Sequence, residues 1–182
     1  MTKALLLIDV QNDYFPGGAM ELEGADEAVA AASRLLAGFR SRGAPVIHVR
    51  HLSLRPGAGF LLPGTAGAEI HASVRPLGGE PVFEKHFPNA FRDTGLAGHL
   101  KANAIGELVV AGMMTHMCVD TTVRAAFDLG LRCTLAKDAC ATRALVLGDA
   151  RIAAQDVQLA FLAALEGLFA RVRSAGTILE EL

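Results

Sequence analysis

The stretch ELVVAGMMTHMCVDTTVRAAF, residues 107–127, joins an apolar run to a helical pattern through a glycine and a cysteine. Residues 108–111 are apolar, partly β-branched and followed by Gly112, which predicts a buried strand. Apolar residues then recur at helical spacing over residues 119–129 and stop at a glycine, which predicts a helix. Cys118 would face the free N–H groups and the positive end of that helix, and both lower the pKa of a thiol. The arrangement suits a nucleophile, although a buried cysteine also serves as a small packing residue.

The elements on either side of this stretch alternate between strands and helices. Strands are predicted at residues 4–10, 45–50, 81–84, 108–111, 132–136 and 169–173, and helices at 25–42, 94–102, 119–129, 150–165 and 177–182. Residues 52–79 are rich in glycine and proline and predict a long loop. The alternation predicts a single-domain, doubly wound α/β fold over residues 1–182, with a mainly parallel six-stranded sheet flanked by helices in three Rossmann-like layers.

The composition is that of a globular chain, and its net charge gives no reason to expect binding to nucleic acid or to an anionic membrane. Of the 182 residues, 52% are apolar and 20% are charged, which is enough for one sizeable core. The formal net charge is −2, so we expect neither nucleic-acid nor membrane binding. The Gly57-Ala58-Gly59 segment lacks the third glycine and the helix of a dinucleotide loop, and we expect no cofactor.

The cysteines and the N-terminal sequence indicate in which cellular compartment we expect the protein. Cys118, Cys133 and Cys140 are an odd number without framework spacing, which favours reduced thiols. We interpret Cys133 as a packing residue in a strand and place Cys140 in the loop beyond it, with no assigned role. The first apolar run is too short for a signal-peptide core, and no run reaches transmembrane length. We therefore expect a cytoplasmic protein.

Three polar residues stand where predicted strands end. Asp9 closes the apolar run at residues 4–10, Lys85 follows residues 81–84, and Cys118 follows the strand before its helix. A carboxylate among apolar residues needs a partner, whereas a lone lysine is usually a solvated surface residue. Open α/β sheets bind ligands at the carboxyl ends of their strands. If the three strands are neighbours, the three side chains converge in one crevice.

The sequence resembles the isochorismatase-like cysteine hydrolases, a superfamily that includes nicotinamidases, N-carbamoylsarcosine amidases, ureidoacrylate amidohydrolases and isochorismatase itself. The stretches that carry the resemblance are LLLIDVQNDYF at 5–15, EKHFPNAFRDTGL at 84–96, VVAGMMTHMCVDTTVRAAFDLG at 109–130 and KDACAT at 137–142. The resemblance spans essentially the whole chain, and it implies one isochorismatase-like hydrolase domain.

The resemblance also implies a catalytic triad of Asp9, Lys85 and Cys118. Cys118 would attack the carbonyl carbon of a small amide, carbamoyl or ureido compound and form a thioester. Asp9 would take the thiol proton and pass it to the leaving amine, and Lys85 would keep Asp9 ionised and favour the thiolate. The backbone N–H groups of Met114 and Cys118 would form the oxyanion hole, and the Met113–Met114 peptide bond would be cis. The family's isochorismatase lacks this cysteine, so Cys118 favours C–N hydrolysis.

Nicotinamidases bind a metal through an aspartate and histidines after the second strand, and this chain lacks that aspartate. His48 and His51 are three residues apart, which places them on opposite faces of a strand. We interpret both as packing or pocket residues and expect no metal.

Phe15, Phe87 and His116 flank the triad in sequence and are candidates for substrate binding, although each could equally be a core residue. The resemblance implies a homo-oligomer, either a dimer or a tetramer. The alternative function is a catalytically silent or thiol-redox member of the same fold that serves as a binding or assembly module. The absence of a C-x-x-C motif and the presence of all three triad residues favour the hydrolase.

Overall fold

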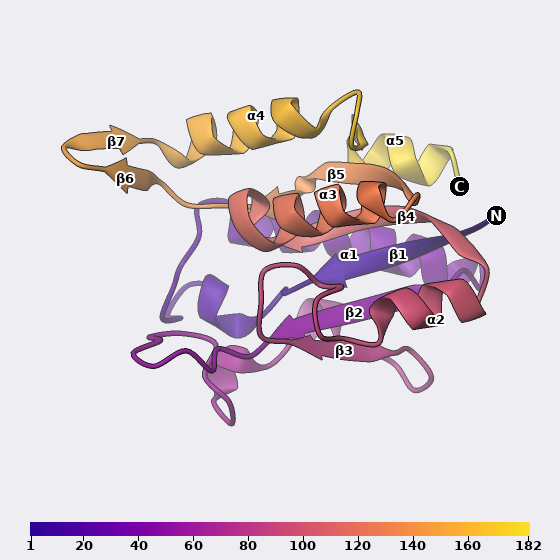
Figure 1. The fold of residues 1–182 in the computed structure, drawn as a ribbon, viewed down its shortest axis with the longest axis horizontal. Coiled ribbons are helices and arrows are strands. Elements are labelled where there is room, and N and C mark those ends of the chain that lie inside the picture. Colours follow the sequence, from indigo (N-terminus) through magenta and orange to yellow (C-terminus); the bar gives the residue numbers. More distant parts are fainter.

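The computed structural model describes residues 1–182 and has a six-stranded sheet at its centre (Figure 1). The strand order is β3-β2-β1-β4-β5-β8, and every neighbouring pair is parallel. The strands are β1 (Thr2–Ile8), β2 (Val46–His51), β3 (Val82–Lys85), β4 (Ile105–Met113), β5 (Arg132–Ala141) and β8 (Arg171–Arg173). The predicted parallel six-stranded sheet is confirmed.

Helices cover both faces of the sheet. The helices α1 (Ala25–Ser41) and α5 (Ala175–Glu180) share one apolar core with the sheet. The helices α2 (Leu96–Ala102), α3 (Asp120–Asp128) and α4 (Ala154–Leu165) contribute to the core on the other face. The result is the predicted three-layer arrangement, with α1 behind the sheet and α2 and α3 in front of it in Figure 1.

Strand β1 lies in the middle of the sheet, and this position explains its apolar sequence. Leu5 and Leu7 belong to the core on the α1 face, and Leu6 and Ile8 belong to the core on the opposite face. Each of these side chains is at most 2% exposed, and burying one contributes about 1.5–3 kcal/mol. A strand buried on both faces needs a continuous apolar run. Asp9 follows directly and therefore stands at the centre of the sheet's carboxyl edge.

The segment between β4 and α3 differs from the predicted helix start. Residues 115–119 form a π-helical turn, in which the Val119 N–H donates to the Met114 carbonyl at 3.2 Å, five residues earlier. Cys118 lies in this turn, and α3 itself begins at Asp120. Single π-helical turns are frequent at functional sites.

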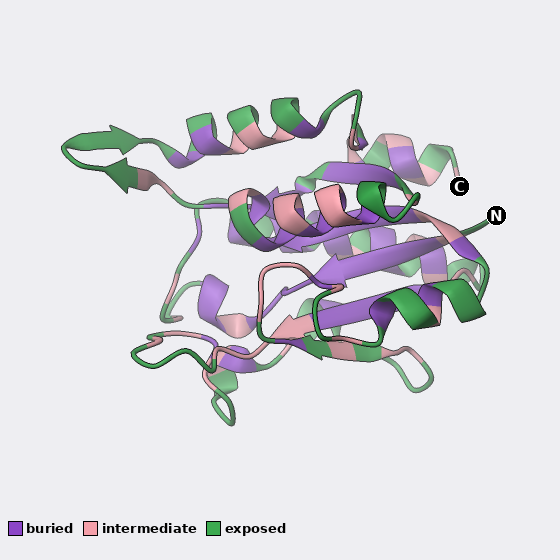
Figure 2. Cartoon of the chain, in the orientation of Figure 1, coloured by how far each residue is buried: buried purple, intermediate pink, exposed green.

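The structure corrects two further boundaries. Strand β5 continues to Ala141, so Cys140 lies within a strand and not in a loop. The predicted helix at 150–165 is shorter, because β6 (Leu145–Leu147) and β7 (Ala150–Ile152) form an antiparallel hairpin before α4 begins at Ala154. The hairpin extends away from the sheet, and Figure 2 shows that most of it is exposed. None of the helices has the length and apolar character that crossing a membrane requires.

Candidate active site

Asp9, Lys85 and Cys118 meet at the carboxyl edge of the sheet. Asp9 follows β1, Lys85 is the last residue of β3, and Cys118 lies in the π-helical turn after β4. Lys85 Nζ lies 2.6 Å from Asp9 Oδ2 and donates to Cys118 Sγ at 3.2 Å. Asp9 and Lys85 are at most 1% exposed, and Cys118 is 6% exposed. The lysine ammonium therefore lies between a carboxylate and a thiol with almost no contact with water.

Asp9 adopts an unusual conformation and keeps one carboxylate oxygen free. Its φ angle is 50°, in the left-handed region that L residues rarely occupy. The Asp9 N–H donates to the Val49 carbonyl at 2.9 Å, which holds this conformation against β2. Oδ1 is buried and accepts no hydrogen bond. A buried acceptor without a partner is costly, and this one is available to a proton that leaves Cys118.

The charges at the site favour a protonated thiol. Burial, followed by the charge of Asp9, raises the pKa of Cys118 to about 12, although the Lys85 ammonium opposes this. Our expectation of a lowered thiol pKa is therefore wrong: desolvation and the carboxylate outweigh the helix terminus. Burial acts to lower the pKa of Lys85, but Asp9 and Cys118 outweigh burial and raise it above its usual value. Lys85 is thus charged, and the nucleophile needs a base.

His51 is a third partner of the Lys85 ammonium. Its Nδ1 lies 3.1 Å from Lys85 Nζ. Burial, together with the charge of Lys85, lowers the pKa of His51 to about 4, so the ring is neutral and accepts a hydrogen bond from the ammonium. Gln11 holds the backbone of His51 from both sides, because its side chain accepts from the His51 N–H at 2.7 Å and donates to the His51 carbonyl at 2.9 Å.

A cavity of about 600 Å³ opens beside Cys118. Its lining is mostly apolar and comes from the loops after β1, β2 and β3 and from the turn after β4. The lining residues are Tyr14, His51, Ser53, Leu54, Arg55, Ala58, Phe60, His86, Phe87, Pro88, Met114, Met117 and Cys118. A cavity of this size and character beside a nucleophile is a plausible binding site for a small molecule.

Polar residues after β1 hold the wall of this cavity. Gln11 donates to the Ala68 carbonyl at 2.7 Å, and the Asn12 side chain donates to the Ala66 carbonyl at 2.8 Å. The Asp13 carboxylate accepts from the Leu61 N–H at 2.6 Å. These bonds fix the loop between β2 and β3, so the polar segment after β1 builds the cavity wall.

The backbone at Met114 also faces this region. The peptide bond between Met113 and Met114 is cis. The Met114 N–H donates to no group of the chain, although the residue is only 4% exposed. A buried N–H without an acceptor is rare, and this one is free for a substrate oxygen.

Comparison with known proteins agrees with the fold. The isochorismatase domain family matches residues 3–175. The chain belongs to the isochorismatase family.

Two relatives of this isochorismatase-family chain match nearly its full length, and a third matches about three quarters of it. An uncharacterized isochorismatase family protein of Bacillus subtilis, YddQ, is 49% identical over 180 residues, which are 99% of this chain and 100% of YddQ. The crystal structure of an isochorismatase hydrolase from Oleispira antarctica has a TM-score of 0.95 and 47% identity, and covers 98% of this chain and 96% of its own. The nicotinamidase of Escherichia coli is 32% identical over 76% of this chain and 82% of its own length. The chain is an enzyme, a hydrolase of the isochorismatase family.

The structure brings some of the predicted binding residues to the cavity of this family member and not others. Phe87 lines the cavity. Phe15 does not, because its ring stacks on His71 with the centroids 4.1 Å apart. His116 does not line it either, because its Nδ1 hydrogen-bonds the Thr142 hydroxyl at 2.5 Å. Nearness to a triad residue in sequence therefore does not by itself place a side chain in the cavity.

Two histidines that we interpreted as packing or pocket residues have separate places. His48 lies on the α1 side of β2 and contacts Glu80 at 3.0 Å, whereas His51 reaches the triad. They lie on opposite faces of the strand, as their spacing predicts. The contact of His51 with Lys85 and the place of Tyr14 in the cavity lining were not predicted, because both depend on how the loops fold over the edge of the sheet.

Asp9, His51 and Cys118 carry potential metal-ligand atoms within 4.8 Å of one another. However, Lys85 Nζ already lies within 3.2 Å of an atom of each of them. A metal ion among these atoms would stand beside a buried positive charge. The residues therefore fit an ammonium group and do not fit a metal ion.

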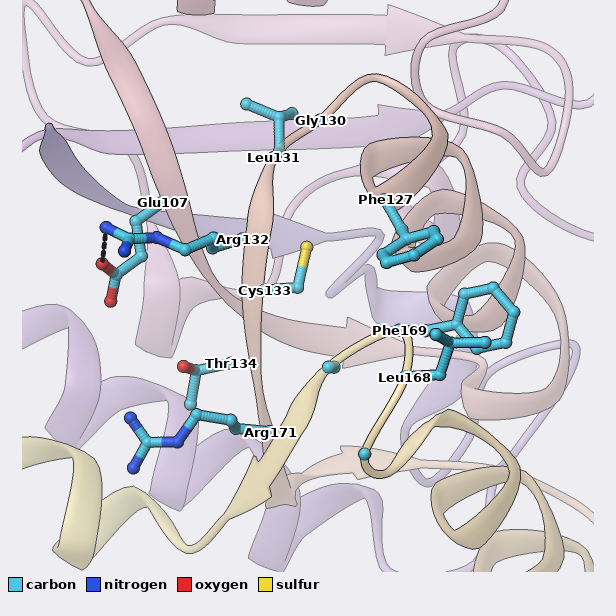
Figure 3. Close-up of a pocket in the computed structure, with 12 residues that line it drawn as sticks. Glu107, Phe127, Gly130, Leu131, Arg132, Cys133, Thr134, Leu168, Phe169 and Arg171 are labelled. Atoms are coloured by element: carbon cyan, nitrogen blue, oxygen red, sulfur yellow. Dashed lines mark hydrogen bonds and ion pairs between the residues drawn. The ribbon is translucent and has the colours of Figure 1, made fainter.

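A second cavity of about 440 Å³ lies at the opposite, amino-terminal end of β5 (Figure 3). It includes Cys133, the aromatic pair Phe127 and Phe169, and the ion pair between Glu107 and Arg132 at 3.2 Å. None of the triad residues lines it. Ligands of parallel sheets bind at the carboxyl ends of the strands, so the cavity at Cys118 is the candidate active site.

Proposed function

We propose that this enzyme hydrolyses the C–N bond of a small amide, carbamoyl or ureido compound through a thioester on Cys118. The observation that carries the proposal is the buried contact of Lys85 Nζ with Asp9 at 2.6 Å and with Cys118 at 3.2 Å, beside a cavity of about 600 Å³. A family relative named nicotinamidase acts on an amide and supports the same type of reaction.

In the first step, the thiol proton passes to Asp9 while Cys118 Sγ attacks the carbonyl carbon of the substrate. Asp9 is the base because its Oδ1 has no other hydrogen-bond partner. The thiol pKa of about 12 means that the thiolate forms only as the attack proceeds. Lys85 remains charged and stabilises the sulfur as it becomes anionic.

The tetrahedral intermediate carries its charge on the former carbonyl oxygen. The N–H of Met114, which has no acceptor within the chain, and that of Cys118 donate to this oxygen. The C–N bond then breaks, and Asp9 returns the proton to the leaving nitrogen. Ammonia or an amine departs, and the acyl group remains on sulfur.

In the second step, a water molecule gives its proton to Asp9 and attacks the thioester. The C–S bond breaks, the proton returns to the sulfur, and the acid product leaves. No step requires a metal or a redox cofactor, because Asp9 and Lys85 supply the proton transfer and the charge stabilisation. Phe87 contributes an apolar wall for the substrate.

We also propose that the enzyme works as a homo-oligomer in the cytoplasm. The three cysteines are free thiols, which suits a reducing compartment. The exposed apolar hairpin of β6 and β7 supports self-association, because Val146 and Leu147 are 69% and 82% exposed.

The test is ammonia release from a panel of small amides, carbamoyl compounds and ureido compounds, with and without a metal chelator. We expect release by the wild type that the chelator does not change, and no release by Cys118→Ala or Asp9→Asn. Circular dichroism checks that both variants remain folded. Wild-type rates in either variant would refute the mechanism, and chelator-sensitive release would indicate a metal-dependent reaction.

A further inference from the structure

The lining of the active-site cavity carries positive charge only. Arg55 is the charged residue that lines it, and no aspartate or glutamate lines it. The whole chain has the opposite balance, with 19 acidic and 17 basic residues. The second cavity, by contrast, includes Glu107. The charge of the active-site lining is therefore suited to an anionic group on the substrate.

The Arg55 guanidinium is free to bind such a group. It forms no ion pair and no hydrogen bond within the chain, whereas Arg40 pairs with Glu80 at 2.7 Å and Arg50 pairs with Glu84 at 3.0 Å. Arg55 is exposed and also lines the cavity, so it lies on the solvent side. A guanidinium in this position recognises a carboxylate through two parallel hydrogen bonds.

The space between Cys118 and Arg55 is large and apolar. Phe60, Phe87 and Met117 contribute to its walls. A volume of about 600 Å³ is within the range that encloses a drug-sized ligand. A carboxamide group alone would leave most of this apolar surface in contact with water, so the substrate needs an apolar body.

We propose that the substrate is an amide with an alkyl or aromatic body and a carboxylate at its far end, and that Arg55 binds this carboxylate. This inference rests on the proposed function, because it places the amide at Cys118. The apolar body fills the cavity, and Arg55 at the solvent side selects the anionic end.

The test compares matched ligands that differ only in the carboxylate. Monoamides of dicarboxylic acids, from succinic to sebacic acid, are paired with alkanamides of equal length, and 3-(4-carboxyphenyl)propanamide is paired with 3-phenylpropanamide. Calorimetry with the Cys118→Ala protein measures binding without turnover. We expect the best carboxylate ligand to bind about tenfold tighter than its neutral partner. Arg55→Gln should abolish this preference, Arg55→Glu should reverse it, and added salt should weaken it.

Arg34→Gln is the matched control, because Arg34 is exposed on α1, forms no ion pair and does not line the cavity. It should retain the full preference. Equal binding of the paired ligands, or a preference that survives Arg55→Gln, would refute the inference.

Hydrolysis of the same ligands by the wild type tests the proposed function separately. Turnover of both partners with equal kcat/KM would refute the inference and leave the hydrolase intact. Arg55-dependent binding without any Cys118-dependent turnover would refute the proposed function instead. Absence of binding by every ligand of the series would refute the inference.

Discussion

At the scale of single residues, the site holds a positive charge between two groups that compete for a proton. Asp9 and the low-polarity surroundings favour the neutral thiol of Cys118, and Lys85 favours the thiolate. His51 accepts the remaining hydrogen bond from Lys85 at 3.1 Å and keeps the ammonium in place. In the resting enzyme the Cys118 thiol is therefore protonated and unreactive, and it becomes a nucleophile only when Asp9 takes its proton.

This arrangement predicts that Asp9→Asn makes Cys118 more reactive toward alkylation while it abolishes hydrolysis. Burial is the largest cause of the raised thiol pKa and the Asp9 charge is the second, so removing the charge lowers the pKa from about 12 toward the usual value. The thiol is protonated below its pKa, and each unit of decrease raises the thiolate fraction at pH about 8 by tenfold. Lys85→Met should act in the opposite direction, because the ammonium stabilises the thiolate.

The measurement is the rate of iodoacetamide modification of Cys118 as a function of pH, followed by peptide mass spectrometry. Cys133 and Cys140 are internal controls, since burial raises the pKa of each to about 12 and neither touches Asp9. Slower alkylation of Cys118 in Asp9→Asn than in the wild type would contradict this account of the charges.

The sequence was sufficient to predict that Asp9, Lys85 and Cys118 lie together, because each follows an apolar strand and the topology of a parallel sheet brings strand ends together. Their assignment as a catalytic triad came from the family resemblance. The sequence was not sufficient for His51 and Arg55, whose roles depend on how an irregular loop folds over the sheet. The thiol pKa was predicted in the wrong direction for a related reason. The helix terminus is visible in the sequence, whereas the extent of burial is a property of the packed molecule.

At the scale of elements, the contact between β1 and β4 sets the distance between Asp9 and the turn that carries Cys118. Ile8 is paired with Gly112 in this register. Gly112 has a φ of +135°, and a Cβ added there would lie 1.9 Å from the Ile8 carbonyl oxygen. Only glycine allows the two strands to approach this closely.

We therefore predict that Gly112→Ala lowers the free energy of unfolding by about 3 kcal/mol or more and removes activity. The clash is with backbone, which cannot rotate away as a side chain can. Gly106→Ala in the same strand is the control, because its added Cβ would meet only the flexible Met1 side chain. Urea unfolding gives the free energy of unfolding of both variants. Equal transition midpoints would show that the close approach at Gly112 does not contribute to stability.

The element boundaries that we mispredicted have local causes. The β6–β7 hairpin has strands of three residues each, too short to give a periodic signal. Gly148 turns the chain there with a φ of 57°, but the alanine-rich sequence that follows continues the helical pattern backward into β7. The prediction ended strand β5 too early, because Lys137 and Asp138 in its second half interrupt the apolar run.

At the scale of the whole molecule, the hairpin of β6 and β7 is the part of the chain that lacks a partner. Its two strands pair only with each other, and isolated two-stranded hairpins are marginally stable in water. Figure 2 shows the hairpin and the adjoining α4 with much of their surface exposed, including Leu159 at 66%. The nearby charges are balanced, with Arg143 and Arg151 against Asp149 and Asp156. We predict that a second copy of the chain covers this surface, because each copy offers both signs of charge to the other across a two-fold axis.

The prediction is that the hairpin mediates assembly of the wild type into a dimer or tetramer of 19.1 kDa chains. Replacing both Val146 and Leu147 with glutamate places like charges within the apolar contact and should yield a monomer that keeps its secondary structure. Leu129→Glu is the control, because Leu129 is 55% exposed at the end of α3, away from the hairpin. Light scattering after size-exclusion chromatography gives the mass of each protein.

A monomeric wild type would refute self-association, and dissociation by Leu129→Glu alone would place the interface on the other side of the molecule. If the double variant is monomeric and still releases ammonia at the wild-type rate, each protomer contains a complete active site, as expected from a triad whose three members come from one chain.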